Sequence, residues 1–171
     1  QAKLLVEYLK KKNIKAQYIK YPIYEHRSGK LINDYLRKGA TISPEDYHIL
    51  QVINKFEFAD TLDKILNTGT WVIAEDYILT GIAWAMSNGL DQKRMEMLYE
   101  PLRKPDKAVV FDGERFKDAI EASHKHETDN SITTKCRSFH LILAKKYDYT
   151  VINANLSIKK VYSDLKKELL I

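Results

Sequence analysis

The chain has 171 residues, of which 44% are hydrophobic and 30% are charged, and its formal net charge is +5. This composition is typical of a folded globular protein and excludes a disordered chain. No apolar run reaches the roughly 20 residues that cross a bilayer, and the single cysteine excludes a disulfide framework and a cysteine-rich zinc site. We therefore expect one domain over residues 1–171, without a signal peptide and with a cytoplasmic location.

The positive charge is concentrated near the start of the chain, because most of the excess of lysine and arginine lies in residues 1–38. A local basic excess fits three explanations: a nucleic-acid partner, a small anionic substrate, or a solvated lysine face. The segment lacks the interleaved aromatic and basic residues, and the motif, of a nucleic-acid-binding module. We therefore expect neither a nucleic-acid partner nor a membrane partner.

Apolar residues recur at helical spacing along most of the chain, and short apolar runs separate these stretches. Ser43 and Pro44 are typical of a helix start, and Gly69 lies just beyond the end of the helix that they open. In chain order, the spacing predicts a helix to residue 12, a strand at 16–21, a helix at 30–38, a helix from 43 to 67, a strand at 70–74, helices at 77–87 and 91–99, a strand at 107–112, helices at 115–121 and 131–146, a strand at 149–153 and a final helix from 157.

The apolar runs TWVIA, KAVVFD and YTVIN predict buried strands, since uninterrupted apolar strands are typical of parallel sheets. The alternation of these strands with helices predicts an α/β fold with a mostly parallel sheet. Ligands of such sheets bind at the carboxyl ends of the strands. The residues that follow the predicted strands are therefore the first candidates for a site: 21–22, 75–77, 112 and 153–155.

Two adjacent acids, Glu75 and Asp76, follow the strand at 70–74 directly. They fit a site that binds a divalent cation or accepts a proton, and they fit equally well a solvated strand end with Asp76 capping the next helix. Asp112 fits a turn residue before a glycine. His124 and His126 lack a third ligand at zinc spacing, which favours surface histidines.

Cys136 lies on an apolar helix stripe, which favours a buried core position without a Cys–His nucleophile pattern. The chain has no G-x-x-x-x-G-K-[ST] phosphate loop, and Gly29-Lys30 is interpreted as a helix start.

A series of strings occurs along the chain in a fixed order: QAKLLVEYL, YIKYP, GKLINDYLRKG, NKFE, WVIAEDYILTGIAWA, KPDKAVVFD, HETDNSITTKCRSFHLILA and INANLSIKKV. The fifth is similar to the signature VVxDRYxxSxxAY, the sixth to the strand PDLxxxLD, and the last to DASxSIEEV. Over essentially the whole chain, the ordered set resembles the thymidylate kinase family of the P-loop nucleoside monophosphate kinases.

The resemblance implies a three-layer P-loop-kinase-like fold with a mobile lid around residues 122–130. It implies phosphoryl transfer from ATP to a deoxynucleoside monophosphate, with dTMP as the expected substrate and Mg²⁺ as the cofactor, chiefly by positioning and charge neutralisation. It also implies a homodimer, since the family is commonly dimeric. QAKLLVEYL resembles the helix that follows the family's GKTT, so we expect a strand and the phosphate loop, with the ATP-phosphate residues, to precede Gln1.

The resemblance also assigns roles to individual positions. Glu75 replaces the signature Asp near Mg²⁺, Asp76 replaces a phosphate-contacting Arg, and Lys125 is the long basic side chain of the lid. These three are the predicted catalytic residues, and Glu75 is the predicted metal ligand. The predicted substrate-binding residues are Tyr24, Arg27, Gln51, Lys55, Tyr77, Thr80, Gly81 and Trp84, and the predicted cofactor-binding residues are Lys125, His126 and Asn155.

The chain departs from the family pattern at several of these positions. Gln51 stands where the family has a Phe stacked on the base, Lys55 where it has an Arg on the thymine edge, and Tyr24 where it has an Arg after the second strand. Asp76 repels a phosphate unless a cation lies between them. Two alternatives therefore stay open: a kinase for another deoxynucleotide or nucleoside, and a non-catalytic nucleotide-binding relative.

Overall fold

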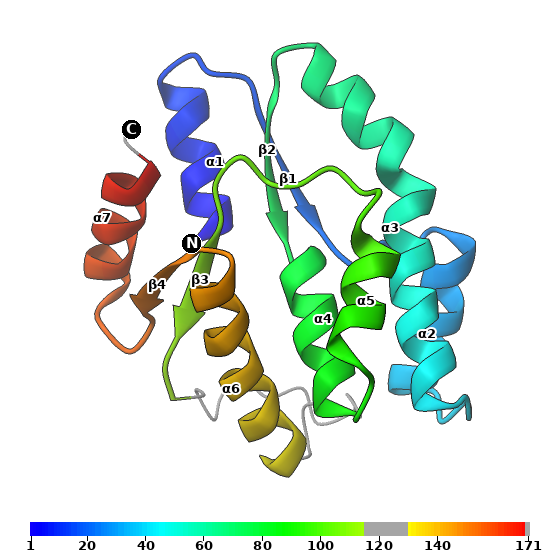
Figure 1. Ribbon diagram of the computed structural model, residues 1–171. Helices are drawn as coiled ribbons and strands as arrows, with labels where there is room; N and C mark the ends of the chain where they lie inside the picture. The colour runs from blue at the N-terminus through cyan, green and yellow to red at the C-terminus, as the bar shows by residue number, and fades with distance from the viewer. Residues whose placement is uncertain (115–129, 170–171) are drawn as a thin grey trace.

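The computed structural model describes residues 1–114 and 130–169, which form alternating helices and strands (Figure 1). The predicted helix at 115–121 and nearly all of the predicted lid around residues 122–130 lie outside the described residues. The elements are α1 (Ala2–Lys11), β1 (Ala16–Lys20), α2 (Arg27–Arg37), α3 (Pro44–Asn67), β2 (Trp71–Glu75), α4 (Ile78–Ser87), α5 (Gln92–Tyr99), β3 (Val109–Asp112), α6 (Asn130–Lys146), β4 (Thr150–Asn153) and α7 (Ile158–Leu169).

Both ends of α3 form where the local sequence predicts them. The Ser43 hydroxyl accepts a hydrogen bond from the Asp46 N–H at 3.0 Å, and Pro44 occupies the first position of α3. Beyond its far end, Gly69 has a φ of +74°, a conformation that glycine adopts without steric cost. The start of α2 differs from the prediction, because this helix begins at Arg27.

The strands form two parallel pairs. β1 pairs with β2 from Ala16↔Trp71 to Lys20↔Glu75, and β3 pairs with β4 from Val109↔Thr150 to Asp112↔Asn153. Parallel strands between helices confirm the predicted α/β class. Within residues 1–114 and 130–169, no strand hydrogen bonds join the two pairs, so the structure describes two short sheets where the sequence predicts one.

The strands are less buried than their apolar sequences predict. Trp71, Phe111 and Val151 keep more than two fifths of their surface exposed. The prediction of strands covered on both faces is therefore wrong for these side chains. The physical reason is that the strands form two separate pairs, and the described residues leave part of the surface of each pair without a packing partner.

Four apolar clusters form the core of the described residues, and the two largest lie around α1 and α7 and around α4 to α6. Leu5 and Leu9 of α1 and Leu165 of α7 are buried in one cluster, and Ile73 of β2 and Val109 of β3 pack against it, which connects the two strand pairs. The other large cluster joins α4, α5 and α6, and its buried members include Ile82, Met95, Tyr99, Cys136 and Leu143. No helix in the described part of the chain combines the length and the apolar character of a membrane span.

Candidate active site

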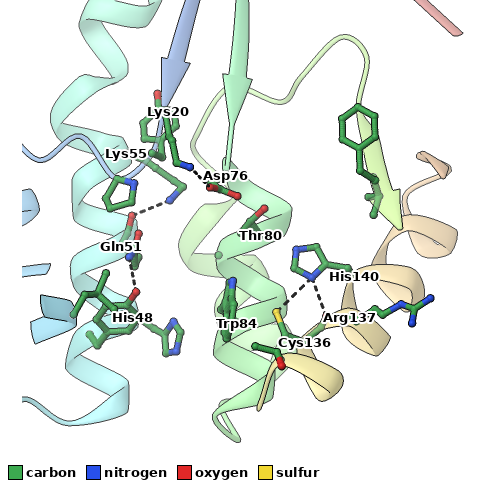
Figure 2. Close-up of a pocket in the computed structure, with 18 of the residues that line it drawn as sticks. Lys20, His48, Gln51, Lys55, Asp76, Thr80, Trp84, Cys136, Arg137 and His140 are labelled. Atoms are coloured by element: carbon green, nitrogen blue, oxygen red, sulfur yellow. Dashed lines mark hydrogen bonds and ion pairs between the residues drawn. The ribbon is translucent and has the colours of Figure 1, made fainter. Parts of the chain in front are cut away.

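A pocket of about 670 Å³ lies where the carboxyl ends of β1, β2 and β3 meet (Figure 2). Its lining residues come from α2 and α3 on one side and from α6 on the other, with α4 between them. Figure 2 shows Gln51 and Lys55 on α3, Thr80 and Trp84 on α4, and His140 on α6. This is the position that a parallel α/β arrangement predicts for a ligand.

The pocket brings together many, but not all, of the residues predicted from the sequence. Those that line it are Tyr24, Gln51, Lys55, Asp76, Thr80, Gly81 and Trp84. Those that do not are Arg27, Glu75, Tyr77 and Asn155. Lys125 and His126 lie outside the described residues, and the functional roles of all these residues stay predictions.

Glu75, the predicted metal ligand, has both carboxylate oxygens engaged. Oε1 lies 2.6 Å from Nζ of Lys20, and Oε2 accepts a hydrogen bond from the Tyr18 hydroxyl at 2.6 Å. Burial favours the protonated acid, but the bonds from Lys20 and Tyr18 outweigh it and lower the pKa of Glu75. A cation at Glu75 would have to compete with these two donors.

Asp76 lines the pocket, next to Glu75. Its Oδ2 lies 3.8 Å from Nζ of Lys20, and its φ of 60° turns the chain sharply after β2. The alternative prediction, that Asp76 caps the following helix, is wrong, because the N-cap of α4 is Tyr77 and no side chain caps that helix. The chain turns at Asp76 instead, and the side chain faces the pocket.

Asp76 fits the chemistry of a magnesium ligand better than Glu75 does. Within residues 1–114 and 130–169, no three histidine, cysteine or acidic side chains are grouped to hold a metal ion. Mg²⁺, however, usually takes only one or two protein carboxylates and completes its shell with water and substrate phosphates. A single pocket carboxylate is therefore sufficient, provided that a phosphorylated substrate supplies further oxygens.

The floor of the pocket is formed by Lys55, which is almost fully buried. Its Nζ donates to the Gln51 carbonyl at 3.3 Å and lies 5.3 Å and 5.7 Å from the ring centroids of Tyr21 and Tyr99. Burial lowers the pKa of Lys55 to about 8, although Asp76 opposes the shift. The hydroxyls of Tyr21 and Tyr99 are also buried, with no hydrogen-bond partner in the described part of the chain.

The fit around the floor is close. A Cβ at Gly81 would lie 2.1 Å from the Tyr99 hydroxyl oxygen, so only glycine is accommodated there without movement. On α3, the Gln51 amide donates to the Tyr47 hydroxyl at 2.9 Å, which fixes its orientation in the wall. The floor thus combines a buried cation with polar groups that could bond to a ligand.

The loop after β1 is fixed by a buried asparagine. The Asn54 side chain accepts from the Ile23 N–H at 2.7 Å and donates to the Ile23 carbonyl at 2.9 Å. Gly29 lies against the same loop, since a Cβ there would be 2.0 Å from the Ile23 carbonyl oxygen. These contacts position Tyr24, the next residue, in the pocket wall.

The remaining wall contains charged residues that sequence reasoning missed. Arg137 of α6 makes two bonds to Asp112, from Nε at 2.6 Å and from Nη2 at 3.0 Å. Arg37 of α2 donates to the Tyr24 hydroxyl at 2.8 Å. Asp112 thus forms an ion pair, which its interpretation as a turn residue did not include. No local pattern marks either arginine, because each meets its partner only through the fold.

Two other predicted positions have structural contacts. Asn155 accepts from the Glu114 N–H at 2.6 Å and donates to the Glu114 carbonyl at 2.9 Å, so its side chain holds the chain just after β3. Cys136 is buried, as predicted, and burial raises the pKa of its thiol to about 12. Its neighbour His140 shares a hydrogen bond of 2.8 Å with the Cys136 carbonyl.

Comparisons with known proteins give the family. The family model described as thymidylate kinase matches residues 1–165. The chain is 30% identical to the thymidylate kinase of Plasmodium falciparum over 98% of this chain and 81% of that protein. It is 38% identical to a protein of Invertebrate iridescent virus 6 over 67% of this chain and 54% of that protein. It is 31% identical to the thymidylate kinase of Schizosaccharomyces pombe over 65% and 52%, so it spans about half the length of these last two relatives.

Solved structures give the fold. The thymidylate kinase of Candida albicans superposes with a TM-score of 0.79 at 24% identity, over 97% of this chain and 82% of that one. The thymidylate kinase of Ehrlichia chaffeensis gives 0.77 at 18% identity, over 99% and 90%. These likenesses confirm the P-loop kinase fold that the ordered strings predict. Together with the family match, they show that the chain belongs to the thymidylate kinase family.

Proposed function

We propose that this protein transfers a phosphoryl group from ATP to dTMP and produces dTDP. The observation that carries the proposal is the pocket at the strand ends, with a buried lysine at its floor and a carboxylate at its rim, in a chain of the thymidylate kinase family. ATP and Mg²⁺ are part of this proposal. The homodimer and the cytoplasmic location stay predictions from the family resemblance.

Lys55 supports recognition of a base with an exposed carbonyl oxygen. An ammonium group has three donors and no acceptor, and Lys55 uses one of them on the Gln51 carbonyl at a long 3.3 Å. A thymine carbonyl is a suitable second acceptor, and it would compensate part of the cost of burying the charge. The Gln51 side chain, fixed by Tyr47, lies in the same wall.

The strand ends support the phosphoryl-transfer step. In this reaction an oxygen of the dTMP phosphate bonds to the γ-phosphorus of ATP, and the bond between that phosphorus and the β–γ bridging oxygen breaks to release ADP. Mg²⁺, when bound, neutralises phosphate charge during this step. The chain contributes Asp76, whose carboxylate faces the pocket, and Lys20, whose ammonium group lies beside both Glu75 and Asp76.

The test is ADP release from ATP and Mg²⁺ with a panel of nucleoside monophosphates, in the full-length protein with the phosphate loop that the family resemblance places before Gln1. We expect dTMP to be the preferred acceptor, and we expect Lys55→Met to reduce kcat/KM for dTMP at least tenfold, on the order expected for one lost charged hydrogen bond. Lys64→Met is the matched control, because Lys64 is exposed on the same helix and does not line the pocket.

Two results would contradict the proposal in different ways. Preference for another monophosphate would show a related kinase of different specificity, which the substitution of Lys55 and Gln51 for the family's residues allows. Calorimetric binding of dTMP without turnover in the same full-length protein would show a non-catalytic relative. The observation that supports a non-catalytic relative is the Asp76 carboxylate in the pocket, because it repels a phosphate that binds without a cation.

A further inference from the structure

We propose that Gln51 selects the base of the substrate by accepting a hydrogen bond from a ring N–H, while Lys55 donates to the carbonyl oxygen beside it. The pair favours a pyrimidine with a carbonyl at C4 and an N–H at N3, as in thymine and uracil, over cytosine. The inference rests on the proposed function, because it assumes that a nucleoside monophosphate enters the pocket. It gives Gln51 a hydrogen-bonding role in specificity, which the sequence resemblance does not assign to this residue.

The placement of the two side chains is the first support. Gln51 and Lys55 are four residues apart on α3, and side chains at this spacing are neighbours on one face of a helix. Both line the pocket, and both are at least nine-tenths buried (Figure 2). The edge of a single planar base can therefore contact both side chains.

The orientation of the Gln51 amide is the second support. Its Nε2 donates to the Tyr47 hydroxyl at 2.9 Å, one turn earlier on α3. Tyr47 is itself buried, with its ring centroid 4.7 Å from that of Tyr35, so the hydroxyl is held in place. Among the described residues, Oε1 of Gln51 accepts no hydrogen bond. This buried acceptor is available to a donor on a ligand, which would recover the free energy lost on burial.

Lys55 supplies the complementary donor. Its ammonium group has three N–H donors and no acceptor, and it uses one donor on the Gln51 carbonyl at 3.3 Å. The two side chains thus present an acceptor and a donor from the same helix face. The ligand edge that matches them has a donor next to an acceptor.

The edge of thymine matches this pair, and the edge of cytosine does not. Thymine has a carbonyl oxygen at C4 and an N–H at N3, whereas cytosine has an amino group at C4 and an unprotonated N3. With cytosine, the Lys55 ammonium would face an amino group and Oε1 of Gln51 would face a lone pair. A site rejects a close analogue most strongly when its own buried polar groups are left unpaired in this way.

The experiment measures the calorimetric Kd of dTMP and of dCMP with the full-length protein. The two ligands share the phosphate, so contacts to the phosphate cancel in the ratio of the two Kd values, which defines the preference for dTMP. Gln51→Met keeps the length of the side chain and removes the amide. We expect it to weaken dTMP binding roughly 3- to 10-fold, the range for one neutral hydrogen bond, without weakening dCMP binding. Part of the preference should remain, because Lys55 still selects the carbonyl.

Tyr47→Phe tests the positioning of the amide. It keeps the buried ring and removes the hydroxyl that holds Nε2 of Gln51. The released amide can turn its Nε2 towards N3 of cytosine, so the preference for dTMP should fall by a smaller factor than in Gln51→Met. Gln51→Glu keeps an acceptor at this position and should retain the preference.

Gln17→Met is the matched control. It makes the same replacement at an exposed glutamine of β1 that does not line the pocket. We expect both ligands to bind this variant as they bind the unaltered protein. Thermal unfolding confirms that each variant is folded, and Tyr47→Phe carries the test if Gln51→Met does not fold.

The outcomes separate the inference from the proposed function. If the unaltered protein prefers dTMP and Gln51→Met keeps the full preference, the inference fails and the proposed function stands. Equal losses for dTMP and dCMP would assign Gln51 a purely structural role and would also overturn the inference. If the unaltered protein does not bind dTMP, both fail together.

Discussion

The buried lysine at the pocket floor gives the sharpest test of how this site is built. Lys55 is almost fully buried, and its pKa is lowered from 10.5 to about 8. Each pKa unit corresponds to about 1.36 kcal/mol, so keeping the ammonium charged inside the folded protein costs about 3 kcal/mol at pH 7. Lys55→Met removes the charge and keeps the length of the side chain, and we expect it to raise the free energy of unfolding by about that amount.

The pH dependence of the free energy of unfolding tests the sign of this effect. The folded pKa of Lys55 lies below its unfolded value, so between about pH 8 and 10.5 the unfolded chain binds the extra proton and the stability of the unaltered protein rises with pH. Lys55→Met has no ionisable group at this position and lacks this pH dependence. The difference in free energy of unfolding between Lys55→Met and the unaltered protein should therefore fall from about 3 kcal/mol at pH 7 to about 1 kcal/mol at pH 10.

Urea unfolding followed by circular dichroism at pH 7 and pH 10 measures this difference directly. Lys64→Met on the same helix is the control and should not be stabilised at pH 7, because Lys64 is exposed and no burial cost is relieved by its removal. A Lys55→Met protein that is less stable than the unaltered one at pH 7, or a gap that is independent of pH, would refute the reasoning. A stabilised variant with weakened dTMP binding would show that the site retains a destabilising charge for function.

Two further predictions concern contacts that join α5 to α4 and to the end of α6. Gly81→Ala should lower the free energy of unfolding by about 1–3 kcal/mol in urea, because its Cβ would lie 2.1 Å from the Tyr99 hydroxyl, and full stability would contradict the close fit. Glu96 accepts hydrogen bonds from Gln92, Lys146 and Tyr147. Burial favours the protonated acid, but these bonds outweigh it and lower the pKa of Glu96 to about 2. The contribution of Glu96 to the free energy of unfolding should therefore be present above pH 4.5 and be lost as the pH falls towards 2. The urea midpoints of Glu96→Gln and of the unaltered protein should converge in acid, and a difference that is independent of pH would contradict this network.

Local chemistry explains why so much of the fold was predictable. A serine cap, a proline at the first helical turn and a glycine beyond the end depend on neighbours in the sequence, and α3 begins and ends where they predict. The exposure of the strands depends instead on what packs against them from distant parts of the chain. An apolar run such as the one around Phe111 carries no information about that packing, so its burial was overestimated.

The same division applies to the pocket. Asp76, which follows a strand, was placed in the site by the rule that ligands bind at strand ends. Arg37 and Arg137 were missed because their partners, Tyr24 and Asp112, are separated from them by 13 and 25 residues. Glu75 was assigned to a metal from its position alone, whereas its bonds to neighbours across the strand pair appear only in the structure.

The positive charge near the start of the chain divides into two parts in the structure. Lys20 and Arg37 reach the pocket. Lys10 and Lys11 lie in the last turn of α1, where cations stabilise the carboxyl end of a helix, and Lys12 lies over the Tyr8 ring at 5.8 Å. The proposed recognition of an anion in this pocket therefore involves a few positioned side chains and not the whole basic segment. A basic surface of the kind that tracks nucleic-acid phosphates would lose affinity steeply with salt, whereas the proposed binding of one monophosphate in this pocket should depend on salt far more weakly.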